Sequence, residues 1–522
     1  SEALHDVLRA SFELLTPRAQ SVLSQASVFA GGFTATAAAE VIRVQGGSPL
    51  AEPRILRQHT LQERVGGRFR MLPVLRERLV AAGSQARDDA RVRWVEWAVK
   101  RGSEAAAQAW TPSLADAFVW FREERGNLLA AFDLAVETCP EQAALIAISV
   151  VEESDALGSF GQGPLLERAL ALDVAPSTRA TVLRMSARRL AASGSSEQAH
   201  RLFERAVELA EPDLAVQLQY DRGELWLVQG DYDRATELLT PLRDADSLVV
   251  RANALRRLGE MARHRRQEAA ATEHFAAGIA AAEASGCVQL IVAVLLSAAD
   301  FEHELAHSSL AHEMLSRALH LTQTHGLKNA MARVLMIRGH AEMADGHAIQ
   351  ARRTLLEACG LERLSGNERR LMQQLLRLGW IEASIGDTAS AREHLREGRA
   401  IADVSATPLV IYFEMNLAVC ELDEGRPGTA LERLNAAVAA AEQASSKVNL
   451  ASLLFHRGWA AGARGRTGDA LADVDRALSL IGESVAVLAG ECYALRACLD
   501  PEDRDSLRRA GELLTSERGA LQ

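Results

Sequence analysis

The chain has 522 residues, of which 48% are hydrophobic, 24% are charged and only 5% are aromatic. This length exceeds what one hydrophobic core can organise, and the scarcity of strand-forming runs favours an all-α protein built from several domains or from repeats. The formal net charge of -11 argues against a general nucleic-acid binder, which would usually be basic.

The six cysteines are scattered along the chain without a CxxC pair, at positions 139, 287, 359, 420, 492 and 498. This usage is typical of reduced core thiols in a cytoplasmic protein. The longest apolar run, at 143–151, is far too short to span a bilayer. We therefore expect a cytoplasmic protein that does not insert into membranes.

Two threonines mark helix starts near the N-terminus. Thr16 is followed by Pro17, which fits an N-cap residue and a first helical residue. Thr34 repeats the capping signal in front of an alanine-rich stretch.

A hairpin signal and a closing helix follow. Residues 61–72 predict two short strands around a turn at Gly66-Gly67. Residues 73–83 predict a helix that has Pro first and Gly last. Three helices, a hairpin and a final helix predict a winged-helix domain over residues 1–85.

Residues 86–177 are expected to form a helical linker, which includes the stretch "WFREERGNLLAAFDLAVE". Together with "LTPRAQSVLSQASVFAGGFTATAAAEVI" and "GRFRMLPVLRERL", it resembles the winged-helix segment and helical linker of STAND (NB-ARC-type) signalling ATPases, among them bacterial transcriptional regulators. In that family the linker carries a Trp, a Glu and an Asn-Leu pair, here Trp120, Glu124, Asn127 and Leu128.

One frame recurs eight times over residues 178–482. An Ala anchor returns every 36 to 40 residues, at Ala199, Ala235, Ala271, Ala311, Ala351, Ala391, Ala430 and Ala470. Twelve residues before each anchor stands a small residue: Ala187, Gly223, Gly259, Ala299, Gly339, Gly379, Ala418 or Gly458. Four residues after each anchor stands a large apolar residue: Phe203, Leu239, Phe275, Leu315, Leu355, Leu395, Leu434 or Val474. Because two helices approach closely only where side chains are small, each match predicts a helical hairpin.

This frame resembles the tetratricopeptide repeat, in the form with extended loops found in large bacterial signalling ATPases. The resemblance implies a right-handed α-superhelix of eight repeats over 178–482, followed by capping helices over 483–522. A ninth match at Ala510 and Leu514, with Cys498 upstream, predicts a worn C-terminal cap. The usual Tyr of the family is replaced by Glu at positions 302, 342, 382 and 421, which leaves the groove geometry open.

The chain contains no GxxxxGKS/T phosphate-binding loop. We expect it to be the C-terminal part of a larger ATPase, so that ATP and Mg²⁺ bind only in a nucleotide-binding domain outside this chain. The chain itself is then expected to hold no cofactor and to catalyse no reaction. A natural relative that lacks the ATPase domain is the alternative.

The stretch "HELAH" at 303–307 matches the HExxH pattern of zinc peptidases, in which both histidines share one helix. In the repeat frame His303 falls near the end of a first helix and His307 near the turn or the start of the second. We therefore expect no metal site and no catalytic residues here, and a chance match of a short motif.

In a superhelix of hairpins the first helices line the concave side. We define the groove positions as those 6 or 3 residues before the small residue of the frame, or 1, 4 or 5 residues after it. The candidate ligand-binding residues at these positions are Tyr220, Glu224, Asn253, Arg256, Glu260, Arg263, His264, Asp300, His303, Glu304, Arg333, Met336, His340, Trp380, Tyr412, Met415, Phe455 and Trp459. This set is polar in its first half and aromatic and apolar in its last half, which suits a peptide or protein segment.

The function expected from the resemblance is that of a sensor arm. The repeats would bind a protein or peptide trigger and relay it through the winged helix to the protein's own nucleotide-binding domain. A DNA-binding transcriptional regulator and a peptide-sensing protein without the ATPase domain are the alternatives. The basic stretch at 256–266 is weak support for DNA binding, because acidic neighbours balance it and no aromatic residues interleave it.

Overall fold

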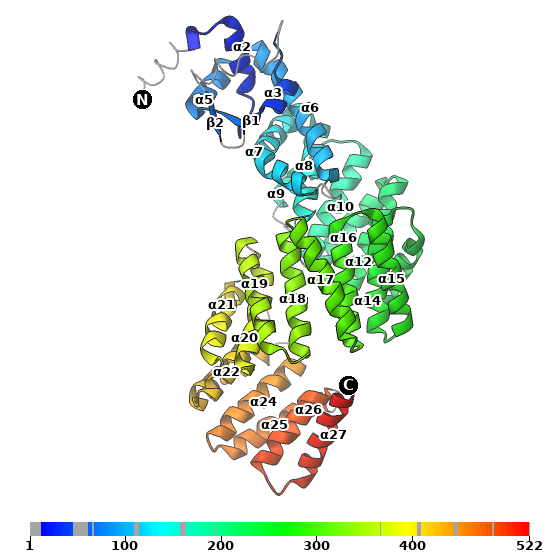
Figure 1. Cartoon of the computed structure of the whole chain (residues 1–522), viewed down its shortest axis with the longest axis vertical. Coiled ribbons are helices and arrows are strands. Elements are labelled where there is room, and N and C mark those ends of the chain that lie inside the picture. Colours follow the sequence, from blue (N-terminus) through cyan, green and yellow to red (C-terminus); the bar gives the residue numbers. More distant parts are fainter. Residues whose placement is uncertain are drawn as a thin grey trace. The chain divides into compact units, whose positions relative to one another are not determined.

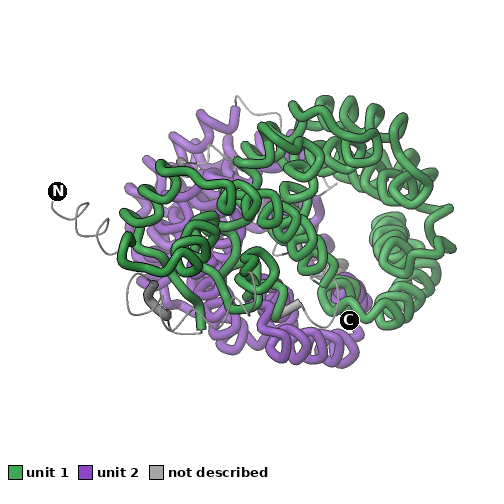
Figure 2. The backbone as a smooth tube through the Cα atoms, turned by 90° about the horizontal axis from the view of Figure 1, so that it is seen from above, with its two compact units in different colours: residues 1–294 green, residues 295–522 purple. Residues whose placement is uncertain are grey.

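The structure is a computed structural model that describes residues 12–44, 61–64, 67–108, 114–156, 163–193, 195–365, 367–404, 409–442, 447–482 and 485–520. The chain folds as two compact units, residues 1–294 and 295–522, and the boundary between them falls within helix α16 (Val288–Glu304) (Figure 2). Helices dominate both units.

The N-terminal part of the first unit combines short helices with a small sheet (Figure 1). Its elements are α2 (Pro17–Ala26), β1 (Phe33–Thr34), α3 (Ala35–Val41), β2 (Leu61–Arg64), β3 (Arg68–Met71) and α5 (Pro73–Ala82). The strands form an antiparallel sheet in the order β1-β3-β2, with Phe33 opposite Phe69 and Leu61 opposite Met71.

The predicted hairpin is therefore confirmed as the β2–β3 pair. Its turn residue Gly66 lies outside the described residues, and so does one of the three predicted helices. Strand β1 has no counterpart among the predictions, because a two-residue strand shows no alternating pattern that a sequence can reveal.

The predicted helix starts are confirmed. The Thr16 side chain accepts a hydrogen bond from the Ala19 N–H at 3.2 Å, and Thr34 accepts one from the Ala37 N–H at 3.1 Å. These bonds satisfy backbone donors that a helix leaves open in its first turn. Helix α5 begins at Pro73 as predicted, and Gly83 after it has φ of +60°, which suits glycine.

Four helices follow, and the first of them packs on α2 and α3. They are α6 (Gln85–Gln108), α7 (Leu114–Thr138), α8 (Pro140–Ala156) and α9 (Gly163–Leu170). One hydrophobic core extends from Leu15 to Met185, and within it the Phe29 ring lies 6.2 Å from Trp94 and 5.9 Å from Trp97. The helical character predicted for 86–177 is confirmed for the described residues.

From α10 onward, helices alternate in hairpins (Figure 1). The first helices of the hairpins are α10 (Pro176–Ala192), α12 (Pro212–Val228), α14 (Leu248–His264), α16, α18 (Lys328–Ala344), α20 (Glu368–Ser384), α22 (Val410–Asp423), α24 (Lys447–Ala463) and α26 (Ala486–Leu499). The second helices are α11 (Ser196–Leu209), α13 (Tyr232–Leu239) with the 3-10 turn η1 (Thr240–Asp244), α15 (Glu268–Ser285), α17 (Ser308–Thr324), α19 (Ala348–Ser365), α21 (Thr388–Val404), α23 (Pro427–Ala441), α25 (Thr467–Ile481) and α27 (Arg504–Ala520). The predicted fold class, an all-α superhelix of repeats, is confirmed.

The predicted contact inside the hairpin is present in the five hairpins whose small residue is glycine. A Cβ atom added to the small residue of the frame would lie within 2.5–2.8 Å of the large apolar side chain in four pairs: Gly223 with Leu239, Gly259 with Phe275, Gly339 with Leu355 and Gly379 with Leu395. Gly458 and Val474 form a looser fifth pair, at 3.4 Å. Because real Cβ atoms do not approach other atoms to 2.8 Å, glycine sets the close approach of these helices.

The prediction for the C-terminal cap is wrong in its register. A Cβ atom on Gly490 would lie 2.8 Å from Leu514 Cγ, so Gly490 and not Cys498 is the small residue of the ninth hairpin. Cys498 is exposed and stands one residue before the end of α26. Gly490 and Leu514 each lie about one helical turn farther from the connecting loop than the corresponding residues of the other eight hairpins. The number of residues between the small and the large residue is therefore greater in this hairpin.

In seven of the hairpins, the turn between the paired helices contains a left-handed residue five positions before the Ala anchor. Glycine occupies this place in five hairpins, with φ between +71° and +84°: Gly230, Gly346, Gly386, Gly425 and Gly465. Arg266 and Ala306 hold the same place with φ of +56° and +60°. A side chain with a Cβ atom is strained in this region, so these two turns are the less favourable ones.

The cysteines are all free, but two of them are not core residues. Cys287, Cys359, Cys420 and Cys492 are buried, whereas Cys139 and Cys498 are exposed. The expectation of six core thiols is wrong for the latter two, because both stand next to the end of a helix. Within the described residues, no helix has the length and apolar character to cross a membrane.

Candidate functional site

The first predicted groove residues form a compact charge network in the unit of residues 1–294. The Tyr220 hydroxyl donates to Glu224 at 2.6 Å, and Arg257 Nε donates to the same carboxylate oxygen at 2.6 Å. Glu260 accepts from Arg256 at 2.9 Å and from Arg257 at 2.8 Å. We call these five residues the polar network.

The charges of the polar network are neutralised within the protein. Burial alone would raise the pKa of Glu224, but Arg257 and Arg256 hold it below its ordinary value. The Arg256 side chain is only 12% exposed. The basic stretch around Arg256 is therefore ion-paired, and Arg265 at its end contacts Asp233 at 3.0 Å.

The remaining predicted residues of this unit have local partners. The Asn253 side chain donates to the Val249 carbonyl at 3.0 Å, inside its own helix. The His264 ring lies 5.9 Å from the Tyr232 ring at the exposed end of α14. Arg263 is half-buried on the same helix and has an interaction partner.

In the unit of residues 295–522, the next predicted residues lie on α16 and α18. His303 Nε2 stands 3.5 Å from Asp345, and His340 Nδ1 accepts a hydrogen bond from Arg377. Burial and the nearby Arg377 lower the pKa of His340 to about 4, so this histidine is neutral at pH 7. Asp300 is half-buried and Arg333 is exposed, and both have interaction partners.

The two histidines of "HELAH" lie on different elements, as predicted. His303 belongs to the last turn of α16, whereas His307 is the N-cap residue of α17. His307 Nδ1 lies 2.8 Å from Glu302, and the left-handed Ala306 separates the helices. In the part of the chain that the structure describes, no three His, Cys, Asp or Glu residues are grouped to hold a metal ion.

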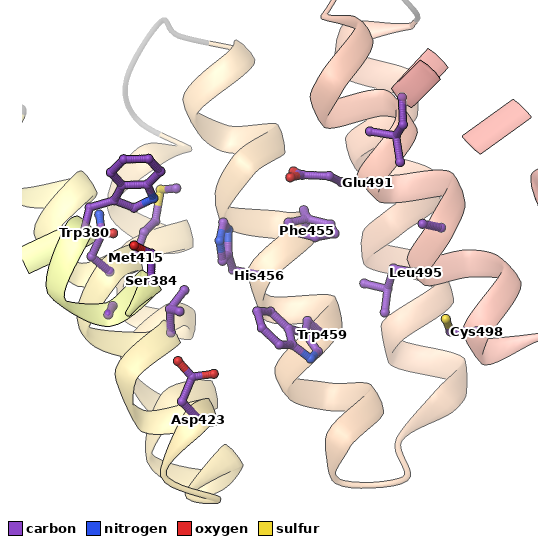
Figure 3. A pocket seen from close by; sticks show the side chains of 15 residues that line it. Trp380, Ser384, Met415, Asp423, Phe455, His456, Trp459, Glu491, Leu495 and Cys498 are labelled. Carbon is purple, nitrogen blue, oxygen red and sulfur yellow. The ribbon is translucent and has the colours of Figure 1, made fainter. Parts of the chain in front are cut away.

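The last predicted residues come together in a pocket of about 680 Å³ within the second unit (Figure 3). We call it the aromatic pocket. It is lined by Trp380, Ala383, Ser384, Met415, Asn416, Val419, Asp423, Phe455, His456, Trp459, Glu491, Ala494, Leu495, Cys498 and Leu514. In Figure 3, Phe455 and Trp459 stand between Trp380 and Met415 on one side and Glu491 and Leu495 on the other.

The pocket exposes aromatic surface. Trp380 is 51% and Trp459 37% exposed, although both are large apolar side chains. Tyr412, which was predicted alongside them, does not line the pocket, since its hydroxyl donates to Asn449 at 2.8 Å. The groove positions of α20, α22, α24 and α26 thus supply most of the lining.

Four lining residues of α26 are absent from the predicted set: Glu491, Ala494, Leu495 and Cys498. Glu491, Ala494 and Leu495 stand 1, 4 and 5 residues after Gly490, at the groove positions that this glycine defines. They were missed because Cys498 was taken as the small residue of that hairpin. Asp423 was missed although it stands five residues after Ala418, which the frame already contained.

Buried carboxylates replace the usual Tyr of the repeat under this groove. Glu342, Glu382 and Glu421 are each buried in the hairpin and paired with a residue three positions after the Ala anchor. Glu342 accepts from Thr354 at 2.7 Å, Glu382 lies 2.7 Å from His394 Nδ1, and Glu421 accepts from Arg433 at 2.7 Å. The departure from the family pattern is thus a polar pair that bridges the two helices of a hairpin.

Two of the four linker residues that carry the STAND resemblance, Glu124 and Asn127, lie at the contact between α7 and the N-terminal sheet, whereas the Trp120 ring lies 6.2 Å from that of Trp97 on α6. Buried Asn127 accepts from the Gly31 N–H at 2.9 Å and donates to the Gly32 carbonyl at 2.8 Å. Buried Glu124 forms an ion pair with Arg68 of β3, and Arg68 also donates to Gly32 at 3.1 Å. We call this arrangement the linker clamp.

Comparisons with known proteins show the fold. No model of a known protein family matches the chain, and no curated protein sequence matches it. The apo form of RapI is 11% identical, and the match covers 65% of this chain and 98% of that one with a TM-score of 0.52. The chain has a tetratricopeptide-like repeat fold.

Two further solved structures are similar at lower scores. A STAND protein with a tetratricopeptide repeat sensor from Pyrococcus horikoshii is 13% identical, and the match covers 97% of this chain and 64% of that one with a TM-score of 0.41. A Rap protein complexed with competence and sporulation factor is 13% identical, with 64% and 99% covered and a TM-score of 0.42.

Proposed function

We propose that this chain is a non-catalytic arm that binds a protein or peptide trigger on the concave side of its repeats. The aromatic pocket carries this proposal. Its large apolar side chains remain exposed at groove positions of four successive hairpins, and an apolar patch rimmed by polar groups is typical of an interaction site. Repeat proteins present such surfaces on the inner side of the superhelix.

We further propose that the arm belongs to a STAND-type signalling ATPase of the cytoplasm. Residues 1–85 would be its winged helix and 86–177 its linker, and ATP and Mg²⁺ would bind in a nucleotide-binding domain outside this chain. The linker clamp supports a relay, because its buried Asn127 and Glu124 tie α7 rigidly to the N-terminal sheet. The trigger would shift the population of states only if it bound one state better than the other.

Panning a random peptide library displayed on phage against the immobilised full chain tests the binding role. We expect peptides to be captured by the wild type and lost on the double change Trp380→Ala and Trp459→Ala. Exposed tryptophans at the centre of an interface commonly contribute about 2 kcal/mol or more each, so the double change should lower the affinity by roughly two to three orders of magnitude.

The matched control is Leu364→Ala, which truncates another exposed apolar side chain, 80% exposed, on the second helix α19. This variant should capture peptides like the wild type. Equal capture by the double tryptophan variant, or no capture by the wild type, would contradict the proposed function.

A further inference from the structure

The aromatic pocket contains acidic side chains but no Lys or Arg. Asp423 at the end of α22 and Glu491 on α26 line it, and none of the fifteen lining residues is Lys or Arg. Within the described residues, neither carboxylate forms a hydrogen bond or an ion pair. Their negative charges are therefore uncompensated by the protein.

The one histidine of the pocket does not supply a positive charge. The His456 Nδ1–H donates to the Ser452 carbonyl at 2.7 Å. Burial lowers the pKa of His456, so its ring is neutral at pH 7. Two carboxylates and no cation remain.

This pattern differs from that of other carboxylates in the same unit. Glu382 and Glu421 are paired with His394 and Arg433, and Glu424 accepts from Arg392 at 2.8 Å. By contrast, apolar neighbours partly desolvate Glu491 and raise its pKa, without any opposing cation. Both carboxylates are exposed, and a partly desolvated carboxylate without a partner gains from a cation that a ligand brings.

The aromatic rings of the pocket suit such a cation. The exposed rings of Trp380 and Trp459 offer π faces, and Trp is the side chain that attracts ammonium and guanidinium groups best. The aliphatic stem of Lys or Arg packs on apolar surface while its charged head stays near water. Met415, Phe455 and Leu495 supply the neighbouring apolar surface.

We propose that the aromatic pocket binds a peptide segment in which a lysine or arginine lies beside an apolar residue. The cationic group is held by one of the two carboxylates, Asp423 or Glu491, which lie on opposite sides of α24, and by a tryptophan face, and the apolar residue packs on Phe455 and Leu495 (Figure 3). This inference rests on the proposed peptide-binding function and specifies the chemistry of the ligand.

The test uses the peptides that the wild-type chain selects from the phage library. We expect Lys or Arg to be enriched next to an aromatic or aliphatic residue. The consensus peptide is then synthesised in two forms, one with the basic residue and one with the neutral isostere norleucine or citrulline. Calorimetry on the full chain should show that the basic form binds roughly tenfold more tightly, with a difference that shrinks as salt increases.

The double change Asp423→Asn and Glu491→Gln should abolish the preference for the basic peptide, because it weakens binding of the basic peptide and leaves binding of the neutral peptide unchanged. Glu432→Gln, which changes an exposed carboxylate outside the pocket, is the matched control and should keep it. The neutral peptide tests the same point on unaltered protein, so a folding defect cannot imitate the result.

Each result decides the matter. Selected peptides without basic residues, or a preference that survives the double change, would overturn the cation inference and leave the peptide-binding function intact. Failure of the wild type to capture any peptide would overturn both.

Discussion

The polar network and the aromatic pocket both occupy groove positions, but they handle charge in opposite ways. In the polar network, Glu224 and Glu260 are paired with Arg256 and Arg257 of the same protein. In the aromatic pocket, Asp423 and Glu491 have no partner among the described residues. The groove positions of the repeat frame therefore hold two kinds of charge, one that is paired within the protein and one that has no partner among the described residues.

The largest expected difference between the two regions is in stability. Glu224→Ala leaves Arg257 and the Tyr220 hydroxyl without their shared acceptor, which should lower the free energy of unfolding by roughly 2–3 kcal/mol. Glu491→Ala removes no internal contact and should change it by less than about 0.5 kcal/mol. Urea unfolding followed by circular dichroism compares the two variants. Similar losses of stability in both would contradict the proposed difference between the polar network and the aromatic pocket.

The paired carboxylates beneath the groove predict a pH effect. The hydrogen bond that His394 Nδ1–H donates to Glu382 raises the pKa of His394 above the ordinary 6.5, although burial opposes it. The stabilisation is fully present below pH 6.5 and is lost as the pH rises through the raised value. His394→Gln should therefore lower the free energy of unfolding by about 1 kcal/mol at pH 6 and by less at pH 9.

Thermal unfolding of the wild type and His394→Gln at both pH values measures this difference. Arg352 also donates to Glu382 at 3.0 Å and remains in the variant, so that the carboxylate keeps one partner. A stability gap that widens toward pH 9 would contradict the predicted ion pair.

The smallest predicted effect concerns the turn in "HELAH". Ala306 is left-handed where Gly346 stands in the next hairpin with φ of +83°. Ala306→Gly relieves this strain and should raise stability by roughly 0.5–1 kcal/mol, after the greater freedom of glycine in the unfolded chain is subtracted. Gly346→Ala, the reverse change at the equivalent place, should lower stability, and unchanged stability in both would refute the assigned turn geometry.

Much of this fold follows from the spacing of small and large residues. The contacts of Gly223 with Leu239 and of Gly379 with Leu395 follow from a 16-residue spacing, because hairpin geometry repeats in register. The same spacing failed for Gly490 and Leu514, where the contact lies a turn farther from the loop. Spacing cannot reveal such a shift when no neighbouring repeat confirms it.

The candidate site was predictable in part. The frame placed Trp380, Phe455 and Trp459 together, since groove positions of successive first helices face the same side. The frame could not predict that Arg256 forms an ion pair with Glu260, because this pairing depends on side-chain geometry. Nor could it find Glu491 until the register of the last hairpin was known.

The most direct measurement is hydrogen–deuterium exchange of the full chain with and without a selected peptide at saturation. We expect slowed exchange in segments that cover 380–384, 415–423, 455–459 and 491–498, and no change over 220–264. Protection confined to 220–264, or to the second helices of the hairpins, would contradict the claim that the aromatic pocket is the binding site.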